Sequence, residues 1–218
     1  MEFDSINGDI RLLECLGECM GRRIETVKLS DCDAKPALNA VLTLVDGIQV
    51  KNLVITCDFS NEIASHIMAA IVTHNIDHLE LGVINFKASE PVATLLELSS
   101  HIRSLHISYC DPLGADDFFG INEDAWLKLI LDIFSRKTDT LIIENCRNGR
   151  FLSARSVEFL CQRLTSFGKK ISFKASCNTY TNFLSDTINN YLVKADVTGS
   201  PGHRFLSVIH SSRKSARK

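Results

Sequence analysis

The chain is poor in residues that interrupt a fold, and it has no long apolar run. It contains 4 Pro and 11 Gly among 218 residues, which excludes a collagen-like or low-complexity protein. Its longest apolar stretch, residues 67–72, falls far short of the ~20 residues that cross a bilayer. With 45% hydrophobic residues and a net charge of −2, it is too apolar and too weakly charged for a disordered tether. We therefore expect a folded protein without membrane contact.

Motifs for metal, nucleotide and disulfide chemistry are also missing. The 8 Cys form no C-x-x-C pair, and Cys15 with Cys19 would supply only half of a four-ligand zinc site. No phosphate-binding glycine loop occurs. Glu2 and Asp4 stand where a secretory signal carries basic residues, so we expect a cytoplasmic or nuclear location and free thiols. No cofactor, metal or small-molecule substrate is expected.

What the chain does have is an internal repeat. Six short segments of alternating apolar residues begin at Val27, Leu53, Leu79, Leu105, Leu141 and Ile171. The first four start 26 residues apart, and the last two follow after 36 and 30 residues. Alternation rich in Val, Ile and Leu predicts strands. A fixed period favours a solenoid over a doubly wound sheet, which has no reason to repeat its strand sequence.

Helical patterns fill the intervals between these segments. Ile63, Ile67 and Ile71 form an apolar stripe on one helix face. Similar stripes lie at 38–45, 92–96, 127–134 and 157–164. The expected N-caps are Ser60, Ser89, Asn122 and Ser153. Strands alternating with helices over short connections predict an α/β fold with parallel strands and right-handed crossovers.

The repeat resembles the leucine-rich repeat superfamily. Its pattern L-x-L-x-x-C/N fits the copies ending at Cys32, Cys110 and Cys146, whereas the last position is Asp58, Ile84 and Ser176 in the other three copies. The Cys-containing, 26-residue form is similar to repeats of ribonuclease-inhibitor-like proteins and of F-box-associated proteins, including nematode ones. The resemblance implies a short solenoid with a curved parallel sheet, outer helices and a stacked ladder of buried cysteines.

The same resemblance implies a role in protein recognition, including substrate recognition linked to ubiquitin ligases. Residues 1–30 contain no Pro, and nothing there resembles the Leu-Pro opening of an F-box. We therefore expect any adaptor-binding element to lie on another chain or to have been lost.

A single domain over 1–210 is expected, because a repeat array needs a different unit at each end. Residues 1–23 would form an N-terminal cap whose helix covers 9–20, and 24–177 would hold the six repeats. Residues 178–210 would form a C-terminal cap, in which strands 191–197 and 205–209 make a hairpin over the last parallel edge. Residues 211–218 are expected to be a basic, disordered tail.

The charge is unevenly distributed along the chain. Residues 199–218 carry five basic residues and no acids, so the net charge of −2 leaves −7 for residues 1–198. Nucleic-acid binding would need a basic stripe on the folded part, so we do not favour it. The basic tail leaves a nuclear address open.

Residues that alternate with the buried positions would point to the concave side of the sheet. The expected partner-binding residues there are Lys28, Val54, Thr56, Glu80, His106, Ser108, Ile142, Glu144 and Lys174. Six strands ~4.8 Å apart give a strip about 30 Å across, wide enough for one side of an interface of ~800 Å². We predict a non-catalytic scaffold that binds a partner protein here; a plain solvated sheet surface is the alternative.

Three further readings stay open. Glu80 and His106 would lie close enough to serve a hydrolase, although Ser108 stands roughly 7 Å along the strand from His106, too far for a nucleophile and its base. Phe118 and Phe119, in an insertion at 111–121, would either anchor a partner or pack beneath their loop. Either surface could also mediate self-association. If His106 titrates against Glu80, binding should change between about pH 5.5 and 7.5.

Overall fold

The computed structural model describes residues 2–4, 23–30, 49–86, 91–109, 123–144, 153–167, 169–176, 193–198 and 205–210. The strands are β1 (Glu2–Asp4), β2 (Arg23–Ser30), β3 (Gln49–Phe59), β4 (His78–Phe86), β5 (Ser104–Tyr109), β6 (Thr140–Glu144), β7 (Ile171–Ser176), β8 (Val193–Thr198) and β9 (Phe205–His210). The helices are α3 (Asn61–His74), α4 (Pro91–Ser99), α5 (Glu123–Phe134) and α6 (Ala154–Leu164), followed by the 3-10 turn η2 (Thr165–Phe167). The chain is thus an α/β protein, as the sequence predicts.

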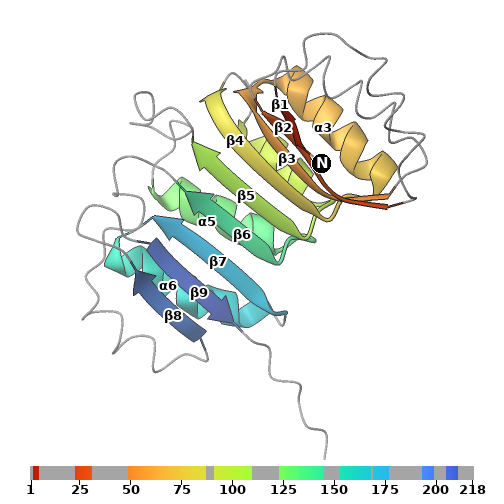
Figure 1. Ribbon diagram of the computed structural model, residues 1–218. Coiled ribbons are helices and arrows are strands. Elements are labelled where there is room, and N and C mark those ends of the chain that lie inside the picture. Colours follow the sequence, from red (N-terminus) through yellow and green to blue (C-terminus); the bar gives the residue numbers. More distant parts are fainter. Residues whose placement is uncertain are drawn as a thin grey trace, which may run out of the picture.

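All strands belong to one nine-stranded sheet in the order β1-β2-β3-β4-β5-β6-β7-β9-β8 (Figure 1). Strands β1 to β7 are parallel and follow chain order. Leu53 pairs with Leu79, and Leu79 pairs with Leu105, so paired residues on these strands are 26 apart in the sequence. Parallel connections are right-handed, so crossovers that all advance in one direction place their helices on one face. Figure 1 shows α5 and α6 on the far side of the sheet.

The core lies between the sheet and these helices. Along β2 to β7, alternate side chains are buried, for example Leu79 and Leu81 on β4, each 1% exposed. They pack in a single apolar cluster with helix residues such as Ile67 and Ile130. Within this cluster, the Phe134 ring of α5 meets the Phe173 ring of β7 edge to face. The stripes predicted for α3, α4, α5 and α6 are therefore the faces that bury against the strands.

Two of the predicted N-caps are confirmed. Ser60 has an extended backbone, and its hydroxyl accepts a hydrogen bond from the Ile63 N–H at 3.3 Å. The Ser153 hydroxyl accepts from the Ser156 N–H in the same way. At the other end of α3, Asn75 adopts a left-handed conformation with φ 53° and closes the helix.

The ends of the sheet agree only in part with expectation. Strands β8 and β9 are antiparallel, and β9 pairs with β7, so the predicted strand pair does cover the last parallel strand. Strand β1 was not predicted, and it extends the sheet beyond β2. None of the helices in the described ranges is long and apolar enough to cross a membrane.

Several predicted features lie outside the described residues. They are the helix at 9–20, the helical stripe at 38–45, the N-caps Ser89 and Asn122, the cysteines Cys32, Cys110 and Cys146, the loop residues Phe118 and Phe119, and the tail 211–218.

Charges of alternating sign line the edge of the sheet where the strands begin. Glu25 and Lys51 take equivalent places on β2 and β3, and Asp77, Arg103 and Asp139 immediately precede β4, β5 and β6. Lys51 Nζ lies 2.7 Å from Glu25 Oε1, and Arg103 Nε lies 3.8 Å from Asp77 Oδ1. Each exposed pair contributes only about 0–1 kcal/mol, but the alternation favours this strand order over others. We call this set the edge ladder.

A buried threonine ties two neighbouring repeats together. The Thr138 side chain is completely buried, and its hydroxyl lies 3.0 Å from both the Ser99 and Ile102 carbonyl oxygens. The Thr138 N–H also donates to the Ser99 carbonyl. These contacts join the turn before β6 to the end of α4 and the turn before β5.

Replacing Thr138 by Val should therefore destabilise the fold. The substitution leaves a buried carbonyl without its hydroxyl donor, so we expect the free energy of unfolding to fall by about 1–3 kcal/mol. Urea denaturation would measure it. Thr140→Val is the matched control, because the Thr140 hydroxyl is half-buried and donates only to the neighbouring Asp139 carboxylate. Equal stability of the two variants would contradict this role for Thr138.

Candidate functional site

All nine residues predicted to bind a partner lie on one side of the sheet, the side opposite the helices. Their neighbours along each strand are the buried core residues, whereas they themselves are half-buried. We call this set the opposite face: Lys28, Val54, Thr56, Glu80, His106, Ser108, Ile142, Glu144 and Lys174.

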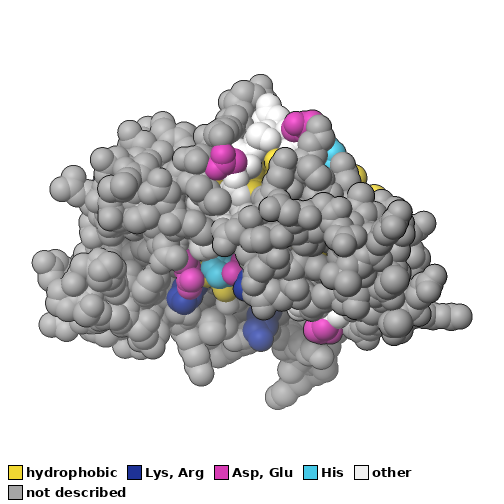
Figure 2. All heavy atoms as spheres, turned by 45° about the horizontal axis from the view of Figure 1, so that its top comes forward, with side chains coloured by type: hydrophobic (Ala, Val, Ile, Leu, Met, Phe, Trp, Pro, Cys, Tyr) yellow, Lys and Arg dark blue, Asp and Glu magenta, His cyan; other side chains and the backbone are white. Residues whose placement is uncertain are grey.

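Strand register arranges the opposite face in two rows. The longer row runs straight across six strands as Lys28, Val54, Glu80, His106, Ile142 and Lys174. The shorter row, two residues further along, runs as Thr56, Gly82, Ser108 and Glu144. Figure 2 shows acidic, basic and histidine side chains gathered in one hollow of the surface, with apolar side chains between them.

His106 lies between two carboxylates that come from the strands on either side. Its Nδ1 is 3.6 Å from Glu80 Oε2 on β4, and its Nε2 is 3.4 Å from Glu144 Oε2 on β6. Both distances exceed the usual range of an N–H···O hydrogen bond. Nε2 is buried and has no hydrogen-bond partner. A neutral imidazole has a single N–H, so one of its two nitrogens must then present a lone pair to a carboxylate.

Glu144 is the well-compensated carboxylate of the pair. Lys174 Nζ on β7 donates to Glu144 Oε1 at 2.5 Å. Burial of Glu144 opposes its ionisation, but the hydrogen bond and charge of Lys174, with a smaller contribution from His106, outweigh burial and lower the pKa of Glu144. Glu144 is therefore ionised and held in place at neutral pH.

Glu80 is held much less firmly. Its side chain is 45% exposed, and its ion contact is the 3.6 Å approach to His106. Among the described residues its carboxylate accepts no side-chain hydrogen bond. We call Glu80, His106, Glu144 and Lys174 the charged cluster. Among the described residues, Glu144 has a close charged partner in Lys174, and Glu80 has none.

Among the described residues, the geometry at His106 differs from that of a serine hydrolase. Serine hydrolases direct one ring nitrogen of the histidine to a hydroxyl and the other to a carboxylate, whereas both nitrogens of His106 face carboxylates. The described cysteines, Cys57 and Cys161, are buried. Burial, with the charge of Glu158, raises the pKa of Cys161 to about 11, so its thiol is protonated and a poor nucleophile.

Metal binding finds no support in the described ranges either. No three His, Cys, Asp or Glu side chains in them are grouped so that they could hold an ion. The alternation of His106 with carboxylates therefore forms a row of ion contacts and not a ligand set.

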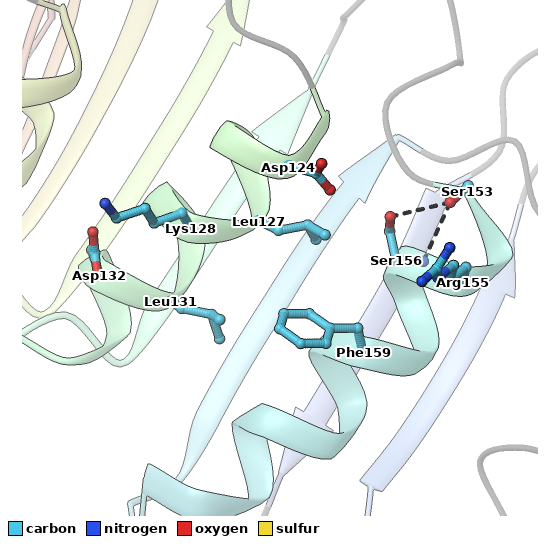
Figure 3. A pocket seen from close by; sticks show the side chains of 9 residues that line it. All are labelled: Asp124, Leu127, Lys128, Leu131, Asp132, Ser153, Arg155, Ser156 and Phe159. Carbon is cyan, nitrogen blue, oxygen red and sulfur yellow. Dashed lines mark hydrogen bonds between the residues drawn. The ribbon is translucent and has the colours of Figure 1, made fainter.

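A second hollow lies on the helix side, between α5 and α6, with a volume of about 770 Å³ (Figure 3). Leu127, Leu131 and Phe159 form its apolar part, and Phe159 is 37% exposed. Its rim mixes two acidic and two basic side chains: Asp124, Asp132, Lys128 and Arg155. Because these charges cancel, the groove shows no preference for a partner of either sign.

Sequence reasoning found the residues of the charged cluster but not all of their contacts. The approach of Glu80 to His106 was expected from strand spacing. The second carboxylate, Glu144, was placed on the face without a partner, although pairing Ser108 with Glu144 puts it diagonally next to His106. Sequence analysis did not predict the groove at Phe159. The feature that indicates it is an aromatic residue on the polar side of the α6 stripe.

The chain matches no known protein family, no curated protein and no solved structure.

The lowered pKa of Glu144 predicts a pH-dependent contribution to stability. A carboxyl group whose pKa is lower in the folded than in the unfolded protein stabilises the fold above its unfolded value near 4.5, and this stabilisation is lost as the pH falls through its folded value. Glu144→Gln should therefore cost about 0.5–1 kcal/mol at pH 7. The cost should shrink as the pH falls below 4.5 and through the lower folded pKa of Glu144.

Urea denaturation of both proteins over that pH range tests the prediction. Glu97→Gln is the control, because Glu97 is an exposed glutamate on α4 away from the cluster. A constant difference between wild type and Glu144→Gln at every pH would show that Lys174 does not stabilise ionised Glu144.

Proposed function

We propose that the chain is a non-catalytic scaffold that binds a partner protein on the opposite face. The charged cluster is the observation that carries this proposal. Glu80, His106 and Lys174 lie in one row with Val54 and Ile142, and Glu144 lies in the neighbouring row, on a sheet whose other side is firmly packed. Among the described residues, Glu80 has no hydrogen-bonded partner. A rigid surface that combines apolar spots with an unsatisfied charge suits recognition of a complementary surface.

The proposal extends to the architecture. We interpret the chain as a short leucine-rich-repeat solenoid, in which the opposite face is the concave one. The sequential order of β2 to β7 and the 26-residue step between paired residues support this interpretation. Substrate recognition linked to ubiquitin ligases is the biological role that the repeat resemblance suggests.

The width of the face is sufficient for part of a stable interface. The row from Lys28 to Lys174 crosses six strands, and five spacings of ~4.8 Å give it a length of about 24 Å. One side of a standard interface buries about 800 Å². The two rows lie two residues apart, roughly 7 Å along the strands, so a partner contacting both would complete such an interface with contacts beyond the rows.

The alternatives remain distinguishable. A hydrolase that used Glu80 and His106 would lose turnover in His106→Ala, whereas a scaffold would only bind less tightly. A self-associating chain would show a mass by light scattering that rises with concentration. Phe118 and Phe119 stay a predicted second contact, to be tested by deleting 116–120.

Reversing the charges of the opposite face should abolish partner binding. The test variant is Glu80→Lys/His106→Glu/Glu144→Lys, and affinity capture from lysate read by mass spectrometry compares it with wild type. The control Glu97→Lys/His101→Glu/Asp132→Lys makes the same changes of charge on the helix side. Circular dichroism first establishes that both variants fold.

We expect a set of proteins that wild type and control capture equally and that the face variant loses. Reversed charges would meet like charges across the interface, which costs several kcal/mol. Partners that persist on the face variant would contradict the proposal and would direct attention to the helix side or to Phe118 and Phe119.

A further inference from the structure

We propose that the partner presents a lysine or arginine side chain to Glu80, with its aliphatic stem lying on Val54. This inference rests on the proposed function and specifies the chemistry of the partner. Val54 on β3 pairs directly with Glu80 on β4, so an apolar surface and a half-exposed carboxylate lie side by side. Long basic side chains suit such a site, because they bury their stems on apolar surface while the charged head meets an anion.

The charged side chains of the opposite face favour a basic partner over an acidic one. Lys174 is engaged by Glu144, and Lys28 has an interaction of its own, so neither lysine is left to receive an acidic partner. Glu80 is the charged group of the face without a hydrogen bond. Residues 1–198 together carry −7, which would steer basic partners towards this part of the chain.

His106 makes the site sensitive to pH. It is faced by Glu80 from β4 and by Glu144 from β6, while Lys174 from β7 reaches it only through Glu144; its neighbours on the same strand face, Ser104 and Ser108, are uncharged. A protonated His106 would satisfy Glu80 from within the chain and compete with the partner's cation. Protonation of His106 should therefore weaken the binding of that cation.

A displayed library of random 12-residue peptides, selected at pH 7.5 on the full chain, tests this inference. Affinities of selected peptides without histidine are then measured by fluorescence anisotropy. We expect a recurrent Lys or Arg, and replacing it by norleucine should weaken binding about tenfold, as should Glu80→Gln. Glu97→Gln should change nothing.

The pH dependence gives a second readout. As the pH is lowered from 7.5 and His106 is protonated, the affinity of wild type should fall several-fold, whereas His106→Gln should show a flat profile. Glu80→Gln is close in size to the native residue, and circular dichroism checks that both variants keep the fold.

The outcomes separate this inference from the proposed function. Peptides that the charge-reversed face variant no longer binds, but that lack a basic residue or ignore Glu80→Gln, would overturn the inference and leave the scaffold standing. A library that yields no peptide dependent on the opposite face would contradict the proposed function itself. If peptides bind only after residues 211–218 are removed, the chain's own basic tail is the ligand of Glu80. That result would overturn the inference that another protein supplies the basic side chain.

Discussion

The in-register stacking of parallel strands is the constraint on which the rest of the structure depends. Side chains alternate between the two faces of a strand, so a slip of one residue in any pairing would turn Leu79 or Leu105 outwards and bring Glu80 or His106 into the core. Burial of the apolar residues against α3 to α6 thereby fixes the register. The two rows of the opposite face are a consequence of that register, since each polar residue is positioned by buried neighbours on its own strand.

Periodicity explains how much of this arrangement could be predicted. The alternation of Leu79 and Leu81 predicts both a strand and its buried side, and the 26-residue step predicts the alignment of Glu80 with His106. The contact of Glu144 with His106 crosses the 36-residue interval, where the repeat no longer specifies the pairing, and it runs diagonally to the next row. The three-residue strand β1 has too few alternating positions to be recognised. Exposure of Phe159 depends on how far apart α5 and α6 lie, which a single stripe does not encode.

The charged cluster also has an energetic meaning. Polar networks in folded proteins stabilise when every member is satisfied, and a partly satisfied network is costly. Lys174 and Glu144 satisfy one another, while Glu80 and the buried Nε2 of His106 do not reach that state. Partial exposure of Glu80 to water reduces the cost, which is why the fold tolerates it. Local departures from full satisfaction are expected where a residue serves recognition and not stability.

The edge ladder and the opposite face show two uses of the same stacking. In the edge ladder the sign alternates from strand to strand, so a β3 that skipped β4 and paired with β5 would set Lys51 beside Arg103 and raise the energy. Charged side chains there form ion pairs within the chain and help to specify strand order. On the opposite face, the uncharged side chains of Val54 and Ile142 interrupt the alternation of sign, so no lysine or arginine stands next to Glu80 in its row. The edge ladder therefore supports the fold, whereas the longer row of the opposite face leaves Glu80 available for the partner that we propose.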